Sequence, residues 1–536
     1  MDGGQTNRLL ILGLDGLSWP LLEPLLEAGA MPHLARLRRE GAWGPLASVV
    51  PTHSATAWAS FLTGQNPARH GVTDFTVRQP DGSYRHARPA RRDTFWHHLA
   101  QGGQRVGVVN FPVTYPPDPV PEGSFLVSGM LSPKGRTFTS PAWLGDELLA
   151  AVPGYRLDLE WQLCAGREGA LLAELTDMTR RRAEAAAYLE ERFRPDCLAV
   201  ALIGPDRLQH ALWRHLDPGH PAHDPAQANE LRPAIHGFYA ALDEAAGQLV
   251  ASYGERVLVL SDHGFQAAAW QFRVDDWLAE RGWLARAAGR SRLERWARRL
   301  DRPWVRHLRK RLVKDISRHL TTFAPGGTLD WSHTVAFCPW NAQQGVRLNV
   351  RGREPQGIVA PGAEHERLRE EIAGALRQAT EPRSGRRVVD QVWRREEIYH
   401  GPHLEAMPDL VLTLRPGFAS SPLQPGLWDA TGWGSGDHSP AGILVAQGPE
   451  ITPGYLEGAA LIDVAPTALY LLGQSLPSTM DGRVLTGALD PALLAARPVQ
   501  IQEPDDTMSE ADAPQATLTP AEEAEVQDRL RGLGYL

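Results

Sequence analysis

The chain has 536 residues, of which 43% are hydrophobic and 22% are charged, and its formal charge at pH 7 is -8. This apolar content is enough to build a packed core, which excludes a chain that is disordered throughout. Three widely separated cysteines argue against a disulfide framework and against a cysteine-based zinc site. The length suits one large α/β domain with insertions, or two to three domains.

The first apolar segment, Leu9–Leu14, is shorter than a signal-peptide core, and no apolar run reaches the length that spans a bilayer. We therefore expect a cytoplasmic protein without a signal peptide or a transmembrane segment. The charge is unevenly distributed. Between Arg286 and Arg318 there are thirteen Lys and Arg residues and three acidic ones, a local charge of +10, which leaves -18 for the rest of the chain.

Short apolar strands alternate with longer helices, a pattern typical of a mostly parallel α/β sheet. The first strands are continuous apolar runs, as expected for strands that helices cover on both faces. The predicted strands are Leu9–Leu14, Val106–Asn110, Cys197–Ile203, Val257–Ser261, Asp409–Leu414 and Ile443–Ala446. The predicted helices are Pro20–Glu40, Glu168–Phe193, Leu231–Ser252, Glu364–Thr380 and Val464–Leu472.

Two long stretches do not fit this alternation and are interpreted as insertions that form caps over a site at the carboxyl edge of the sheet. The tail begins with an acidic segment that is poor in apolar residues, which indicates a flexible linker. Thr519 and Pro520 then provide the cap and first position of a terminal helix. The predicted parts are a core (1–264, with an insertion at 74–155), a cap region (265–403), the rest of the core (404–498), a linker (499–517) and a helix (518–536).

Acidic and histidine side chains stand at the ends of predicted strands or just before one begins. They are Asp15, Asp206, His210, Asp262, His263 and His438. The i, i+4 spacing of Asp206 and His210 places both on one face of a helix, and strand ends of an open α/β sheet converge on one crevice. Any one of these residues alone is more often a turn or helix-cap residue. Together they form an oxygen and imidazole set that suits zinc, manganese or a similar divalent ion.

Ser54 is the candidate nucleophile. It lies where an apolar helix begins, and the positive end of a helix dipole favours both an alkoxide and a phosphate oxygen. A bound divalent ion can deprotonate a serine hydroxyl without a histidine base. Ser54 could instead be a simple N-cap, and Thr52 and Thr56 are neighbouring hydroxyls, so the residues alone leave this choice open.

The ordered series LGLDG, PTHSATAWASFLTGQNPARHG, GPDRLQH, SDHGF and GDHSPAG resembles the alkaline phosphatase superfamily. The similarity is greatest to its type I phosphodiesterase/nucleotide pyrophosphatase branch, including the relatives known as predicted phosphohydrolases or phosphomutases. It extends from about Arg8 to Gly487 and implies an alkaline-phosphatase-like, mostly parallel central sheet with helices on both faces and an inserted cap.

The resemblance also implies two divalent metal ions, zinc or alternatively manganese, that share one phosphoryl group. It assigns Asp15, Asp262 and His263 to one ion, which also contacts Ser54, and Asp206, His210 and His438 to the other. Attack by Ser54 would give a phosphoseryl enzyme that water then hydrolyses.

The implied activity is a phosphodiesterase acting on a small phosphate ester. Two departures weaken an assignment as a classical nucleotide pyrophosphatase: the residues that follow Ser54 differ from the usual Thr-Phe-Pro-Asn-His-Tyr, and Phe75, preceded by Asp74, replaces a phosphate-binding Asn. The sulfatase motif is absent. Phosphomonoesterase, phosphomutase or phosphotransferase activity at the same site is the alternative, and a non-enzymatic binding protein with a vestigial site is disfavoured by the full ligand set.

The basic segment 286–320 has Leu and Trp residues every three or four positions, which predicts an amphipathic helix pair with a cationic face. This face could contact an anionic lipid or a polyanion. The alternative is a cap helix whose apolar stripe packs on the core and whose arginines are solvated. We predict no stable nucleic-acid partner, and the sequence leaves the oligomeric state open.

Overall fold

The computed structural model describes residues 8–78, 83–159, 167–254, 256–286, 329–340, 342–420, 435–503 and 518–532. Within these ranges, no helix is both long enough and apolar enough to cross a membrane.

A ten-stranded sheet forms the centre of the larger unit, in the order β18-β2-β17-β9-β1-β8-β5-β6-β7, with β19 also paired to β2. Strands β9, β1, β8, β5 and β6 run parallel to one another, whereas β17 pairs antiparallel with β9 and β7 pairs antiparallel with β6. The bounds are β1 Leu9–Leu14, β2 Ala42–Ala47, β5 Val106–Val109, β6 Phe125–Val127, β7 Thr139–Ser140, β8 Cys197–Leu202, β9 Val257–Leu260, β17 Ala441–Gln447, β18 Gly454–Tyr455 and β19 Ala459–Ala460. The predicted mixed α/β fold with a mostly parallel sheet is therefore confirmed.

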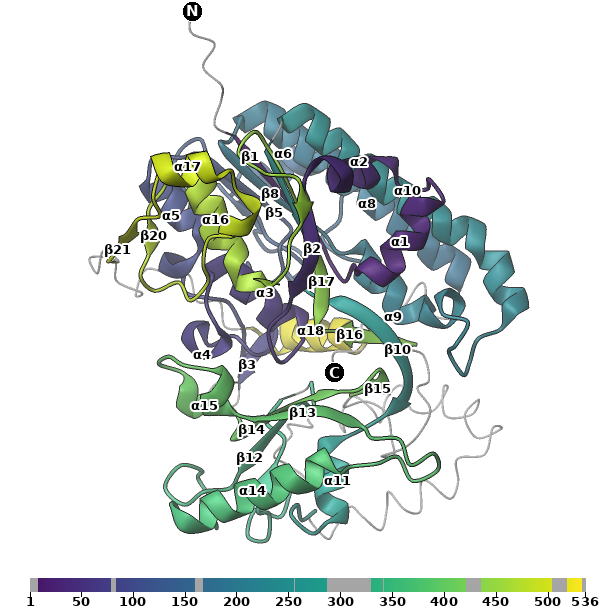
Figure 1. Ribbon diagram of the computed structural model, residues 1–536, viewed down its shortest axis with the longest axis vertical. Helices are drawn as coiled ribbons and strands as arrows, with labels where there is room; N and C mark the ends of the chain where they lie inside the picture. Colours follow the sequence, from purple (N-terminus) through teal and green to yellow (C-terminus); the bar gives the residue numbers. More distant parts are fainter. Residues whose placement is uncertain are drawn as a thin grey trace, which may run out of the picture.

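Helices cover both faces of this sheet, as Figure 1 shows. On one side lie α1 (Trp19–Glu27), α2 (Pro32–Glu40), α8 (Glu168–Phe193), α9 (Gly204–Leu216) and α10 (Pro225–Tyr253). On the other side lie α3 (Ser54–Thr63), α5 (Phe95–Gln101), α16 (Val464–Leu471) and α17 (Pro491–Ala496). Every residue of β1, β8 and β9 is buried, as the continuous apolar runs predict.

The predicted helix Pro20–Glu40 is in fact two helices, α1 and α2. Gly29 adopts a left-handed conformation with φ 69° and lies just after α1, a conformation that glycine adopts at little cost. Pro32 then occupies the first position of α2, where its missing N–H has no helical partner to lose.

Residues 74–155 contribute more to the core than an inserted cap would. They supply strands β5, β6 and β7 of the central sheet, together with α5 and α6 (Leu144–Ala151). A small hairpin of β3 (Thr76–Arg78) and β4 (Tyr84–His86) precedes them. This range therefore supplies three strands of the central sheet as well as two helices.

A second unit has its own apolar core, formed mainly by residues between Phe272 and Phe418. A four-stranded sheet, β11-β12-β14-β13, packs with helix α14 in this unit, and β10 runs from the central sheet region toward it (Figure 1). Strand β14, the predicted Asp409–Leu414, belongs to this antiparallel sheet. The bounds are β10 Gly264–Gln271, α11 Val274–Glu280, β11 Ala336–Phe337, β12 Gly345–Leu348, α14 Ala363–Arg377, β13 Val389–Arg394, α15 Arg395–Ile398, β14 Leu410–Leu414, β15 Gly417–Ala419 and β16 Gly436–Ser439.

The predicted basic helices of 286–320 lie almost entirely outside the described residues, as do residues 504–517 of the predicted linker. Residues Ile501–Gln502 form β21, which pairs with β20 (Leu476–Pro477).

The terminal helix α18 (Pro520–Gly532) begins with the expected cap. The Glu522 N–H donates to the Thr519 hydroxyl, and the Thr519 N–H donates to the Glu522 carboxylate. Val526 and Leu530 are buried in the main core, so the helix docks on the larger unit.

Candidate active site

Three parallel strands place the predicted acidic residues at one edge of the sheet. Strand β1 pairs with β8 on one side and β9 on the other, so their carboxyl ends are neighbours. Asp15 directly follows β1, Asp262 and His263 follow β9 after one serine, and Asp206 lies in the first turn of α9, just after β8. All four side chains are buried. The convergence that the sequence predicts is therefore present.

The remaining histidines arrive from α9 and from strand β16. His438 lies in β16, opposite Phe265 of β10, and this pairing brings it back to the end of β9. His210, one turn after Asp206, points its Nε2 atom at the Nε2 atom of His438 across 3.0 Å.

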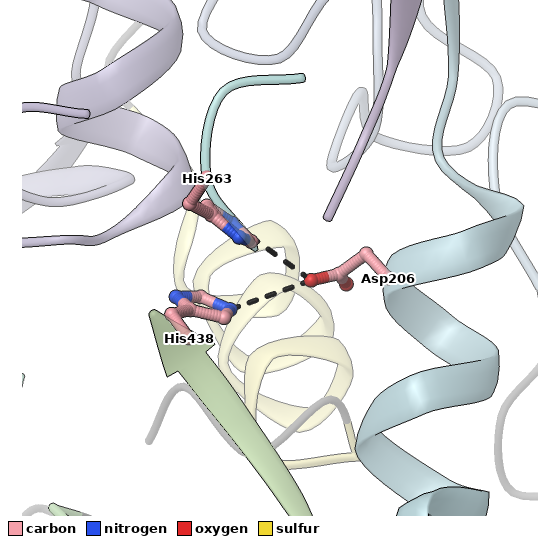
Figure 2. A group of neighbouring side chains, drawn as sticks. All are labelled: Asp206, His263 and His438. Carbon is pink, nitrogen blue, oxygen red and sulfur yellow. Dashed lines mark ion pairs between the residues drawn. The ribbon is translucent and has the colours of Figure 1, made fainter. Parts of the chain in front are cut away.

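Asp206 stands at the centre of this group, and Figure 2 shows His263 and His438 directed at its carboxylate. Its Oδ1 atom lies 3.3 Å from Nε2 of His438, 3.4 Å from Nε2 of His210 and 4.0 Å from Nε2 of His263. The Nε2 atom of His263 also lies 3.2 Å from Oδ2 of Asp262 and 3.6 Å from Oδ1 of Asp15. His263 therefore stands between two groups of carboxylate oxygens.

Ser54 reaches the same cluster from the first turn of α3. Its side chain is buried, and its Oγ atom lies 3.0 Å from Nε2 of His263. The residue in the N-cap position is His53, which makes no side-chain cap bond, and Ser54 is the first helical residue. The structure thus places the Ser54 hydroxyl at a helix N-terminus and beside the acidic cluster, an arrangement that suits a nucleophile more than a simple cap.

Each of the three carboxylates has one oxygen that the surrounding protein holds. The Trp58 Nε1 atom donates to Oδ2 of Asp15 (3.0 Å), the Gly16 N–H donates to Oδ1 of Asp262 (3.3 Å), and the Arg207 Nη1 atom donates to Oδ2 of Asp206 (2.6 Å). The other oxygen of each carboxylate is buried and has no hydrogen-bond donor within the described part of the chain. These three oxygens all face histidine nitrogens.

Gly16 is one position in this arrangement that requires glycine. Its φ is 77°, and a Cβ atom there would lie 2.8 Å from the ring of Phe265 and 3.2 Å from the backbone of Asp206. The absence of a side chain lets the turn after β1 approach the other strand ends closely.

The histidine tautomers are fixed by backbone carbonyls. The Nδ1 atoms of His210, His263 and His438 lie 3.0, 3.1 and 2.9 Å from the carbonyl oxygens of Gly436, Gly264 and Thr52, respectively. A carbonyl oxygen only accepts, so each Nδ1 atom donates, and a ring in its neutral form turns a lone pair on Nε2 toward the cluster. The Nε2 atoms of His210 and His438 face each other at 3.0 Å. A cation between the rings and the carboxylates would satisfy all of them, and metal-ligating histidines characteristically donate their other nitrogen in this way.

The shifted pKa values of the buried groups reflect an excess of negative charge in the cluster. Burial and repulsion from Asp206 raise the pKa of Asp15 from 3.8 to about 7. Burial, with repulsion from Asp15 and Asp206, raises the pKa of Asp262 well above its usual value. Burial works in the same direction on Asp206, but His210, His438 and Arg207 outweigh it and hold its pKa well below the usual range. Burial and the neighbouring His438 lower the pKa of His263, which favours its neutral form.

The residues present therefore fit the metal ions that the sequence implies. Ligand atoms of Asp15, Asp262 and His263 lie within 4.8 Å of one another, and so do those of Asp206, His263 and His438. All seven sequence-predicted residues, including His210 and Ser54, come together. Three carboxylates and three imidazoles form a donor set that zinc and manganese accept.

Three residues of the site have no counterpart among the sequence predictions. Trp58 looks like an ordinary core residue of an apolar helix, yet its indole N–H supports Asp15. Arg207 could have been noticed in the sequence, because it is a charged residue directly after Asp206. Its neighbours in this turn are buried. His53 is buried beside Ser54, and burial and the nearby His438 lower its pKa to about 3. The centroid of its ring lies 5.1 Å from that of Phe75, the buried residue that replaces the asparagine of classical nucleotide pyrophosphatases.

The fold and the site define a hydrolase of the alkaline phosphatase superfamily. The sequence matches the family described as type I phosphodiesterase/nucleotide pyrophosphatase over residues 9–440. Because this match spans most of the chain, the protein belongs to that family and is an enzyme that hydrolyses phosphoric ester bonds; members of the family act on small phosphate esters. No curated protein matches the chain in sequence.

Among solved structures, two of phosphonoacetate hydrolase from Sinorhizobium meliloti 1021 are similar. In complex with phosphonoformate the TM-score is 0.51, and in complex with phosphonoacetate it is 0.50. In both cases the identity is 16%, and the alignment covers 87% of this chain and 96% of that chain. At this level of identity the likeness shows a common fold.

Proposed function

We propose that the protein is a phosphodiesterase that uses two divalent metal ions and forms a covalent intermediate on Ser54. The observation that supports this most directly is the position of the Ser54 Oγ atom, 3.0 Å from Nε2 of His263, a ring that itself lies within 4.0 Å of all three buried carboxylates. A serine hydroxyl with no cation nearby would have little reason to lie in such a setting.

Two sets of residues would hold the ions: Asp15, Asp262 and His263 for one, with Ser54 beside it, and Asp206, His210 and His438 for the other. When bound, the ions would lower the pKa of the serine hydroxyl and neutralise charge on the phosphoryl oxygens. The donor set favours zinc, with manganese as the alternative.

The residues of the chain then have separate tasks. The Ser54 oxygen attacks phosphorus, a new O–P bond forms as the bond to the first leaving alcohol breaks, and the alcohol departs with a proton. The N-terminus of α3 stabilises the negative charge that gathers next to Ser54. Water then attacks the phosphoryl group on Ser54, which restores the hydroxyl and releases a monoester.

We assign substrate selection to the second unit, whose separate core is formed mainly by residues between Phe272 and Phe418. The Tyr399 hydroxyl of this unit donates to the carbonyl of Val50, four residues before Ser54. The second unit therefore contacts the segment that presents the nucleophile, which places it where it can contact the part of a substrate that is not transferred.

The test compares bis-p-nitrophenyl phosphate with p-nitrophenyl phosphate for protein loaded with Zn²⁺ or Mn²⁺. The variants are Ser54→Ala and the matched control Thr56→Ala, which removes a buried hydroxyl two residues away. Loss of the nucleophile should lower the diesterase rate on the order of a thousandfold or more, whereas Thr56→Ala should keep most of it.

Equal diesterase rates for Ser54→Ala and the wild type would overturn the nucleophile assignment. A wild type that cleaves only the monoester would replace the diesterase with a phosphomonoesterase. Transfer of the phosphoryl group to an added alcohol in preference to water would favour the phosphotransferase alternative.

A further inference from the structure

Arg207 is a buried arginine whose side chain joins the metal-binding cluster to a second carboxylate. Its side chain is 1% exposed, and its Nη1 atom donates to Oδ2 of Asp206 at 2.6 Å. Its Nη2 atom lies 3.6 Å from Oδ2 of Asp158 and 3.0 Å from the sulfur of Met130. The side chain of Asp158 is itself only 4% exposed.

This contact divides the two oxygens of Asp206 between different tasks. Oδ2 accepts from Arg207, and Oδ1 is the atom that faces His210, His263 and His438. Free rotation of the carboxylate would exchange the two oxygens or offer both at once. The guanidinium therefore fixes which oxygen is presented.

Arg207 differs from the donors that hold the other two carboxylates. Asp15 is held by the neutral indole N–H of Trp58, and Asp262 by the neutral backbone N–H of Gly16. Of these three donors, only Arg207 is charged. A charged donor makes the shorter and stronger bond.

We propose that Arg207, anchored by Asp158, is a positioning residue that keeps Asp206 a ligand through one oxygen and thereby sets the affinity of the metal position formed by Asp206, His210 and His438. This proposal rests on the proposed two-metal function. Arg207 does not face the nucleophile through any contact described above; it acts through Asp206. Outer partners of metal ligands commonly change metal affinity 10- to 100-fold when they are lost.

The rival explanation is that Arg207 only compensates the buried charge of Asp158. Removing a buried partner leaves an uncompensated charge and destabilises a protein whether or not a metal site is nearby. Arg182 offers a matched control because it is also fully buried, and it donates to the carbonyls of Ala201 and Leu157 instead of to a ligand.

The experiment measures the binding of Co²⁺ to the metal-free full-length protein. The readouts are the number of bound equivalents, the affinity of each from chelator competition, and the visible absorption of the bound Co²⁺, which reports its ligand geometry. Four variants are compared with the wild type: R207M, R207K, the double variant R207M/D158N, and R182M. Thermal unfolding of each variant in the absence of metal reports its stability separately.

The proposal predicts that R207M weakens one of two Co²⁺ equivalents by about 10- to 100-fold and changes its absorption. R207K, which keeps the charge, should recover part of the loss. The double variant should regain thermal stability because Asp158 is neutralised, yet keep the weakened metal position because Asp206 still lacks its donor. R182M should lose stability and keep both affinities.

Recovery of full affinity in the double variant, or equal metal binding in R207M and R182M, would overturn the positioning role and leave the two-metal function intact. A wild type that binds no Co²⁺ would instead overturn the proposed function, and this assignment with it. If R207M does not fold, R207K and the double variant supply the same comparison.

Discussion

Replacing Asp15 with asparagine should stabilise the metal-free protein although it damages the site. The amide has nearly the size of the carboxyl and keeps an acceptor for the Trp58 indole. What it removes is a buried negative charge. Burial and Asp206 raise the pKa of Asp15 from 3.8 to about 7 in the folded protein, so ionising Asp15 there costs about 4 kcal/mol more than in the unfolded chain.

The sign of the pH dependence follows from that raised pKa. Below the unfolded value Asp15 is protonated in both states and has no effect on stability. Between 3.8 and about 7 the folded state keeps the proton that the unfolded state releases, so the cost grows with pH and is complete above pH 7. Asp15→Asn should therefore raise the free energy of unfolding by about 4 kcal/mol at pH 8 and by about 2 kcal/mol at pH 5.

The assay is urea unfolding of the full-length protein, first with a chelator at the two pH values and then with Zn²⁺. With Zn²⁺ at a thousand times its dissociation constant, each intact site adds about 4 kcal/mol to the wild type, and Asp15→Asn should lose most of this gain at one site. The advantage of the variant at pH 8 should thus shrink from about 4 kcal/mol to nearly zero when metal is added. A variant that is less stable than the wild type at pH 8 without metal would refute the argument from buried charge.

Three further predictions concern residues around the site. Burial lowers the pKa of His70 from 6.5 to about 3, so the folded protein loses stability as the pH falls below 6.5, by about 2 kcal/mol at pH 5. In urea unfolding at pH 7.5 and 5, His70→Gln should abolish this contribution to the pH dependence of stability. A pH dependence equal to that of the wild type would contradict the role of His70. Tyr399→Phe removes the hydrogen bond to the Val50 carbonyl, which should lower the free energy of unfolding by about 1 kcal/mol and also lower the diesterase rate. Unchanged unfolding and kinetics would show that this contact is dispensable. Leu530 is fully buried, so Leu530→Ala should weaken the docking of α18 by about 2–5 kcal/mol. The helix should then be cleaved faster in limited proteolysis, and cleavage as slow as in the wild type would contradict the docking.

The convergence of the proposed metal ligands could be predicted from sequence because their placement follows from the chain direction. Asp15, Asp206 and Asp262 each stand just after a parallel strand, and parallel strands bring such positions to one edge. The order of the strands was not needed for this conclusion. Ser54 begins an apolar helix, but Thr52 and Thr56 lie close to it, so the choice among these hydroxyls came from the resemblance to the family.

The supporting contacts depend on tertiary neighbours and left little local signal. Trp58 has the pattern of a core residue, and only the fold shows that its N–H meets Asp15. The partner of Arg207, Asp158, lies 49 positions earlier in the chain. Residues 74–155 looked irregular because β6 and β7 are only three and two residues long, too short for an alternation or an apolar run to stand out.

The central claim is that Ser54 carries the phosphoryl group during turnover, and trapping that group tests it most directly. The metal-loaded enzyme is quenched in acid while it hydrolyses bis-p-nitrophenyl phosphate, and its peptides are mapped by mass spectrometry. The account predicts a p-nitrophenyl phosphoryl group on Ser54 in the wild type and none anywhere in Ser54→Ala. The same group on Thr52 or Thr56, or full turnover by Ser54→Ala, would contradict it.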